Sequence, residues 1–232
     1  MVARADRYIQ LLGSLPAHPR HLFASKQEVI SRLQLDRRLR LLEPEDGKRL
    51  RAIEGVVYWE RLSPEVGDRE LVARGKSLLA CLDNPFLEEL VLWRLEVRTA
   101  IACLRRRQLN MNPPSGSDWG HGRWLQRMRA HWSDPALGLE RVFPWLPEAA
   151  ALLQGGEFVA LEKLLLEQCW NHYRIIEAGH YFDFEAVVLY VLRWDVIARW
   201  TRYDGATARE RFRNLAKQGL AKQASTDPLP GV

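Results

Sequence analysis

One long helix is the element that this sequence specifies most clearly. Asn84-Pro85 places a capping side chain before a proline at the first helical position, which is a strong helix start. Apolar residues then recur in steps of four and three, and so share one helical face: Phe86, Leu90, Trp93, Val97, Ala100 and Leu104. Acidic residues near the start and arginines near the end complement the helix dipole. The sequence therefore predicts a helix over residues 84–109 with one buried face.

A second long helix is predicted toward the end of the chain, where Asp183 can cap its start. One face is formed by Val187, Tyr190, Val191, Trp194, Ile197, Ala198 and Thr201. Another side adds four apolar residues: Val188, Leu192, Val196 and Trp200. Because a helix that is apolar on two sides needs neighbours on both, we expect this one to be central. Asp195 and Arg199 also stand in the favourable acid-first i,i+4 order.

Helices separated by proline and glycine account for most of the remaining chain. Residues 8–19 contain Gly13, Pro16 and Pro19 and predict an irregular lead-in. Capping boxes at Ser25–Glu28 and Thr207–Glu210 predict two helix starts. Pro44 and Gly47 predict a break, as does Gly155-Gly156, and prolines at 135, 144 and 147 predict turns. Further helices are expected over residues 48–62, 68–82, 122–132 and 157–177.

Strand signals are nearly absent, because no sustained alternating run is bounded by hairpin turns. We therefore expect an all-α fold, a multi-helix orthogonal or funnel-like bundle of about nine helices. The two long helices share a plan of acidic start, apolar body and arginine-rich end. That plan indicates either divergent helical repeats or simply two well-capped core helices. Residues 1–222 are expected to form a single helical domain with a loop break near 110–122, and residues 223–232 a disordered tail.

Composition indicates a globular chain that does not cross a membrane. Apolar residues make up 47% and charged residues 27% of the sequence. The opening residues do not resemble a signal peptide, since Arg4, Asp6 and Arg7 interrupt them. No stretch reaches the roughly 20 apolar residues that span a bilayer. Three cysteines, Cys81, Cys103 and Cys169, lie in apolar helical stretches and are expected to be buried thiols in a reducing compartment.

Two patterns could supply metal ligands, and both lack the partners that a complete site needs. Glu177-x-x-His180 has the spacing of di-iron bundles, which use two such pairs plus two further glutamates. Cys169-x-x-His172 offers two ligands where structural zinc needs four, so His172 is expected to be a hydrogen-bonded core histidine. Phosphate-binding loops and the G-x-S-x-G elbow are absent from the sequence. We therefore expect neither catalytic residues, nor a cofactor, nor a metal site.

The nine tryptophans indicate either large packing anchors or a surface that meets a partner, and the net charge of +5 is a mild excess that is also common in proteins binding no acidic partner. Arg105, Arg106 and Arg107, with Trp119 and Trp124 nearby in sequence, are the candidate partner-binding residues. The arginines could bind nucleic acid by charge with tryptophan stacking, or an acidic protein surface, or simply form a solvated helix end. The helix-end interpretation is favoured over nucleic acid, because helix C-termini attract cations in any case.

Three segments resemble known proteins. Leu95-Glu96-Val97-Arg98-Thr99-Ala100-Ile101, leading to Leu104-Arg105, resembles the repeated helix of the central-stalk socket subunit of V/A-type ATPases, called C or d. Residues 186–195, followed by Ile197 and Arg199, look like its near-C-terminal helix. The opening 8–16 and the start Tyr181-Phe182-Asp183-Phe184 resemble an uncharacterised bacterial family associated with V-type ATPases. This chain departs from the socket subunit in being shorter and in carrying Val97-Arg98 where an Asn-Leu step is usual.

The resemblance implies a mechanical function. It implies a non-catalytic subunit that couples the central shaft to the membrane rotor ring and transmits torque for ATP-linked ion transport. Its implied partners are the other rotary ATPase subunits, and its implied location is cytoplasmic, peripheral at the inner face of the membrane. The alternative function is a helical nucleic-acid-binding or adaptor protein based on Arg105–Arg107 and the tryptophan-rich middle segment. A third is an enzyme of unrecognised type that uses a metal through Glu177 and His180.

Overall fold

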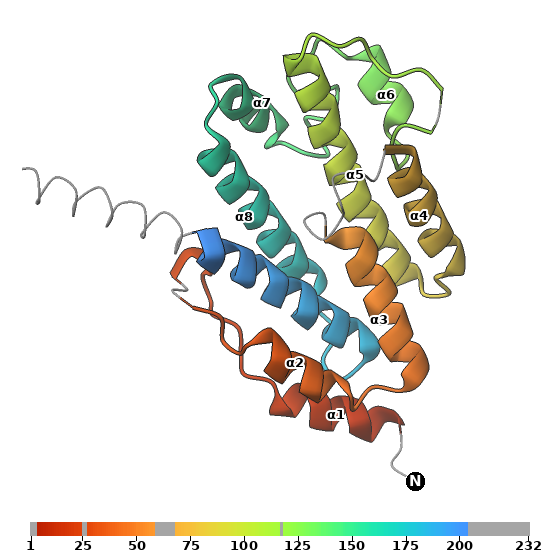
Figure 1. Cartoon of the computed structure of the whole chain (residues 1–232), viewed down its shortest axis with the longest axis vertical. Coiled ribbons are helices and arrows are strands. Elements are labelled where there is room, and N and C mark those ends of the chain that lie inside the picture. Colours follow the sequence, from red (N-terminus) through yellow and green to blue (C-terminus); the bar gives the residue numbers. More distant parts are fainter. Residues whose placement is uncertain (1–3, 25–26, 59–67, 117, 204–232) are drawn as a thin grey trace, which may run out of the picture.

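All regular structure that the model describes is helical, so the predicted all-α class is confirmed (Figure 1). This computed structural model describes residues 4–24, 27–58, 68–116 and 118–203. The helices are α1 (Arg4–Ser14), the 3-10 helix η1 (Leu22–Ala24), α2 (Arg32–Leu39), α3 (Pro44–Val57), α4 (Asp68–Cys81), α5 (Pro85–Gln108), α6 (Leu125–Ala130), α7 (Leu146–Gln154), α8 (Phe158–Ile176) and a last helix over 184–203.

The last helix lies at the centre, as its two apolar sides predict. The Asp183 carboxylate caps it by accepting a hydrogen bond from the Ala186 N–H at 2.8 Å. Every residue from Ala186 to Ala198 is buried, including the charged pair Arg193 and Asp195. Figure 1 shows α1 and α2 on one side of this helix and α8 on the other. A helix with no exposed face over so long a stretch is positioned by its neighbours on all sides.

Hydrogen bonds from aromatic side chains attach the N-terminal segments to the last helix. The Trp194 indole N–H donates to the Ile30 carbonyl at 2.8 Å, and the Tyr190 hydroxyl donates to the Pro16 carbonyl at 2.8 Å. The Tyr58 hydroxyl donates to the Val191 carbonyl at 3.3 Å. Irregular backbone around residues 16 and 30 would otherwise leave carbonyls without partners in the interior, so these bonds allow the segments to be buried.

The helix predicted over 84–109 forms α5 and starts where expected. The Asn84 side-chain oxygen accepts from the Leu87 N–H at 3.0 Å. Leu90, Val97, Ala100 and Leu104 of the predicted face are at most 2% exposed, while Phe86 and Trp93 are half-buried. Burial also extends beyond the predicted face, to Leu87, Val91, Leu95 and Ile101. The helix is therefore covered on more than one side.

Two apolar clusters form the core, and two helices run through both. The first cluster contains α5 residues from Leu87 to Leu95, α8 residues from Leu166 to Tyr173, and the last helix. The second contains α5 residues from Val97 to Leu104, α8 residues from Leu161 to Leu165, and α7. Helices α5 and α8 consequently join the two clusters into one framework.

The glycine-rich segment after α5 is a loop, as predicted, and its far end packs against α4 and α5. The Thr99 hydroxyl accepts a hydrogen bond from the His121 N–H at 3.0 Å, and the buried Glu96 carboxylate accepts one from the Arg123 N–H at 3.0 Å. A Cβ built on Gly120 would meet Thr99 Cγ2 at 2.5 Å, and one on Gly122 would meet Glu96 Cγ at 2.2 Å. Glycine at both positions therefore lets the loop backbone approach α5 closely.

Several predicted boundaries are wrong. The expected irregular lead-in over 8–19 is helix α1 as far as Ser14, because Tyr8 and Leu11 bury one helical face, and the buried Leu15 follows directly. The Tyr8 hydroxyl also donates to the buried Asp46 carboxylate at 2.5 Å. The break expected at Pro44 is instead the first turn of α3, where a proline is well tolerated.

The first described capping box involves Ser31 and Gln34 and opens α2. Residues 27–31 are not helical, so the helix expected directly after Ser25 begins later. The predicted cap at Ser25, the one at Thr207 and the tail after Gln223 lie outside the described residues. Cys103 and Cys169 are buried as expected, but Cys81 is exposed at the end of α4. Among the described helices, none is long and apolar enough to cross a membrane.

Replacing Gly122 tests the close packing of the loop on α5. Gly122 has φ +97°, and its added Cβ would overlap Glu96, whereas Gly116 has φ +77° with open space around it. We expect Gly116→Ala to lower the unfolding free energy by about 1 kcal/mol through backbone strain alone, and Gly122→Ala by about 3 kcal/mol. Urea unfolding of both variants measures the difference. Equal losses would show that the contact with Glu96 does not constrain the loop.

Candidate functional site

A buried cation, Arg94 of α5, lies at the middle of the helical core and is 4% exposed. Burial by itself lowers its pKa, but Cys169 and Tyr173 of α8 and Asp195 of the last helix raise it, and the net shift is upward. The guanidinium thus remains charged, with Asp195 as the nearby buried anion. A buried cation and anion from two different helices hold those helices in one relative register.

Two ion pairs connect α8 and its C-terminal end to the last helix. Arg199 pairs with Glu162, and Arg193 Nη1 lies 2.6 Å from Glu177 Oε2. The Arg193 guanidinium also stands 4.4 Å from the centre of the Trp170 ring. The i,i+4 order of Asp195 and Arg199 suggests a pairing within one helix, and the structure pairs Arg199 with Glu162 of the neighbouring helix α8. Both ion pairs therefore match a charge on the last helix with one at α8 or its C-terminal end.

Cys169 and His172 have separate structural roles. Burial raises the pKa of the Cys169 thiol, which favours the neutral form in spite of the nearby Arg94. The His172 ring stacks on Trp93, with ring centres 3.6 Å apart and planes at 8°. Burial lowers the pKa of His172 to about 4. The expected hydrogen-bonded core histidine is thus a stacked one, and among the described residues neither side chain belongs to a group of metal ligands.

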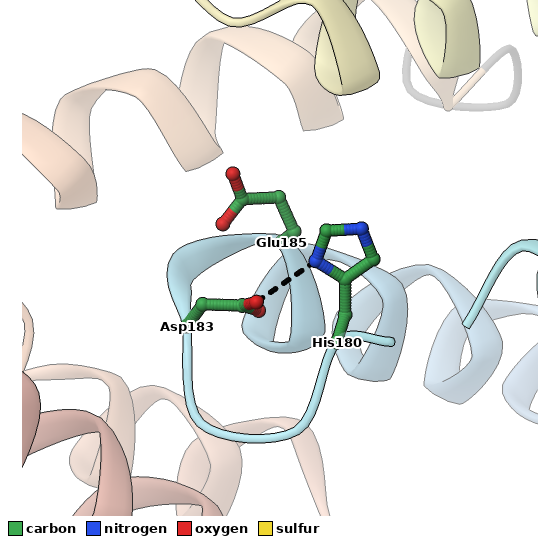
Figure 2. A group of neighbouring side chains, drawn as sticks. All are labelled: His180, Asp183 and Glu185. Atoms are coloured by element: carbon green, nitrogen blue, oxygen red, sulfur yellow. Dashed lines mark hydrogen bonds and ion pairs between the residues drawn. The ribbon is translucent and has the colours of Figure 1, made fainter. Parts of the chain in front are cut away.

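Figure 2 shows the group of side chains that comes nearest to a metal site in the described part of the chain, His180, Asp183 and Glu185. One ligand atom from each lies within 4.8 Å of the others. An imidazole with two carboxylates would suit a divalent ion such as Zn²⁺ or Mn²⁺. The spacing that could have indicated this group is His180-x-x-Asp183-x-Glu185, whereas the sequence analysis considered Glu177 with His180 and treated Asp183 as a cap alone.

All three side chains already have protein partners that explain their positions. His180 Nδ1 is 2.8 Å from Asp183 Oδ2, and the second Asp183 oxygen caps the last helix. Glu185 accepts from the Asn84 side chain at 2.5 Å, which links the starts of the last helix and α5. Glu177, the other residue of the Glu-x-x-His spacing, pairs with Arg193. The arrangement joins two helix starts beside a pocket of about 320 Å³ that Asp183 and Glu185 help to line.

The predicted partner-binding residues have different surroundings. Arg105 is exposed, and Arg106 is half-buried. Arg107 is half-buried and donates to the carbonyls of Trp132 and Asp134, at 3.1 and 2.5 Å, so it supports the turn that follows α6.

Trp119 and Trp124 are half-buried and pack against the second cluster. The Trp119 indole donates to the Gly116 carbonyl at 3.1 Å. The guanidinium of Arg123 stands 5.9 Å from the centre of the Trp124 ring. Arg105 is therefore the most accessible of the five candidates, and a role of this set in binding a partner stays a prediction.

Removing Arg94 tests its electrostatic interaction with Asp195. We expect Arg94→Met to lower the unfolding free energy by about 3 kcal/mol, because the buried Asp195 carboxylate then loses its favourable interaction with this cation. Adding Asp195→Asn should restore part of that loss, and a double-mutant cycle from urea unfolding measures the coupling. If the two single losses simply add, the pair does not act as a unit.

The stacked histidine predicts a pH dependence of stability. The pKa of His172 falls from 6.5 to about 4 on folding, so the unfolded chain binds the proton more tightly. The stability that neutral His172 supports is therefore complete above pH 6.5 and decreases as the pH falls toward 4. We expect His172→Phe, which keeps a ring on Trp93, to reduce this decrease by about 2 kcal/mol. Denaturant unfolding of both chains from neutral to acidic pH isolates the effect, since the two chains share all carboxylates. An identical pH dependence of the unfolding free energy in both chains would contradict the contribution of His172.

Comparisons with protein families, with curated proteins and with solved structures find no match for this chain.

Proposed function

We propose that this chain is a non-catalytic subunit of a V/A-type rotary ATPase that couples the central shaft to the membrane rotor ring. The observation that carries the proposal is the position of the two segments that resemble the socket subunit. Residues 95–105 lie in α5, and residues 186–199 lie in the last helix. Both helices are extensively buried, so the resemblance falls on the framework of the molecule rather than on its edge.

The charged contacts between helices support a mechanical role. A part that transmits torque must resist sliding of its helices past one another. Arg94 with Asp195, Arg199 with Glu162, and Arg193 with Glu177 connect α5, α8 and the last helix. Because slipping by one helical turn would leave a largely buried charge without its partner, such pairs favour a single register.

Exposed apolar residues near the connection between α8 and the last helix support assembly with other subunits. Ile175 is 73%, Tyr181 71% and Phe182 54% exposed. Tyrosine and other large side chains of this kind are common at the centres of protein interfaces. Within the proposal, this end of α8 and the exposed Arg105 at the end of α5 are contact points for partner subunits. The proposed location is cytoplasmic and peripheral, at the inner face of the membrane.

Purification of the tagged chain from its native cells tests the assembly. We expect the catalytic, shaft and rotor-ring subunits of a V/A-type ATPase to co-purify in mild detergent. The variant Arg105→Glu should lower their recovery, since it reverses an exposed charge at a proposed contact. Arg20→Glu makes the same charge change on an exposed residue of the N-terminal segment and serves as the matched control. Recovery of no ATPase subunit with the unaltered chain would refute the proposal.

Membranes from cells that lack the chain separate coupling from attachment. A coupling subunit predicts that ATP hydrolysis continues while ATP-driven ion transport is lost. If both activities persist although the subunits co-purify, the chain is an accessory component and the torque role is wrong.

A further inference from the structure

The groove between α2 and α3 is a separate feature that the proposed function does not use. It has a volume of about 370 Å³, and its floor is formed by Leu39, Leu42 and Leu50. Leu42 and Leu50 are 8% and 3% exposed, and Leu39 is half-buried. A concave apolar surface of this size can hold one or two inserted side chains.

One arginine that lines the groove, Arg32, is already paired with carboxylates. Arg32 donates two hydrogen bonds to Glu54, at 2.5 and 3.1 Å, and one to Asp36 at 2.9 Å. Burial by itself lowers the pKa of Arg32, but these two carboxylates outweigh it, so the net shift is upward. Arg32 is therefore held by carboxylates of the protein itself and is not available to a ligand.

Arg40 and Arg51 are different. Both line the groove and are exposed, and neither belongs to an ion pair within the described residues. Arg37, on the exposed side of α2, adds another cation nearby in the chain. Arginine binds carboxylates through two parallel N–H donors, which gives geometric selectivity as well as charge attraction. The groove thus offers an apolar floor with unpaired guanidinium groups on the helices that border it.

Gly47 keeps the groove open within α3. A glycine inside a helix is unfavourable relative to alanine, so its presence is informative when no backbone strain requires it. A Cβ at Gly47 would meet only Arg51 Nη1, at an ordinary contact distance of 3.5 Å. The fold therefore tolerates a side chain at this position, and what the glycine provides is space beside Arg51.

We propose that the α2–α3 groove binds an acidic protein segment, with an apolar side chain of that segment on the leucine floor and its carboxylates on Arg40 and Arg51. Charge complementarity carries this choice of partner, since the only unmatched charges lining the groove in the described structure are positive. A concave floor favours a protein segment over a flat lipid surface. The proposal does not rest on membership of a rotary ATPase.

Selection of random displayed peptides on the intact chain tests the proposal. We expect the enriched peptides to carry negative charge beside a large apolar residue and to bind in a salt-sensitive manner. Their affinity should fall by about tenfold or more in the double variant Arg40→Glu/Arg51→Glu. The double variant Arg20→Glu/Arg141→Glu has the same charge change at exposed sites outside the groove and should bind as the unaltered chain does. A selection with no enriched peptide, or one without acidic bias, would overturn the proposal.

Two further measurements test the shape of the groove and the lipid alternative. Gly47→Met fills the groove without altering charge. We expect it to weaken binding of the selected peptides, while the circular dichroism spectrum and the unfolding free energy stay close to those of the unaltered chain.

Vesicles of phosphatidylglycerol test the lipid alternative by co-sedimentation. If the chain binds these vesicles through Arg40 and Arg51 and the peptides do not compete, the groove recognises a membrane surface and the proposed partner is wrong.

Discussion

Complete burial of the last helix from Ala186 to Ala198 is the constraint on which the rest of the structure depends. A helix without an exposed face must be surrounded, so α8 on one side and the N-terminal helices on the other are held against it. The same burial includes Arg193 and Asp195, whose charges need partners in a medium of low polarity. Glu177 and Arg94 meet that need from α8's end and from α5. Packing and electrostatics therefore select the same arrangement of helices.

Helix starts could be predicted from the sequence because capping is local. Asn84 and Asp183 each accept a hydrogen bond from an N–H three residues further on, so both partners of the interaction lie within four consecutive residues. Helix α1 was missed for the opposite reason. Its stability depends on burial of Leu11 and on the bond from Tyr8 to Asp46, contacts made with residues far along the chain. Gly13 and the following prolines dominated the local pattern and pointed to irregular structure.

The Glu177-x-x-His180 spacing does not indicate the true neighbours of these two residues, for a related physical reason. A Glu-x-x-His pair shares one face only if the helix continues through both residues, and α8 ends at Ile176, before Glu177. The chain then turns, which places His180 beside Asp183, while Glu177 forms an ion pair with Arg193. The partners of Glu177 and His180 therefore depend on where one helix stops. No residue spacing in the sequence carries that information.

The two clusters sit along the same pair of long helices, and this has a consequence for how disturbances spread. Helix α5 has 24 residues, which corresponds to a length of about 36 Å at the usual rise per residue. Its early turns pack in the first cluster and its later turns in the second, whereas the early turns of α8 pack in the second cluster and its later turns in the first. A tilt imposed on either helix at one end must therefore change the packing in both clusters.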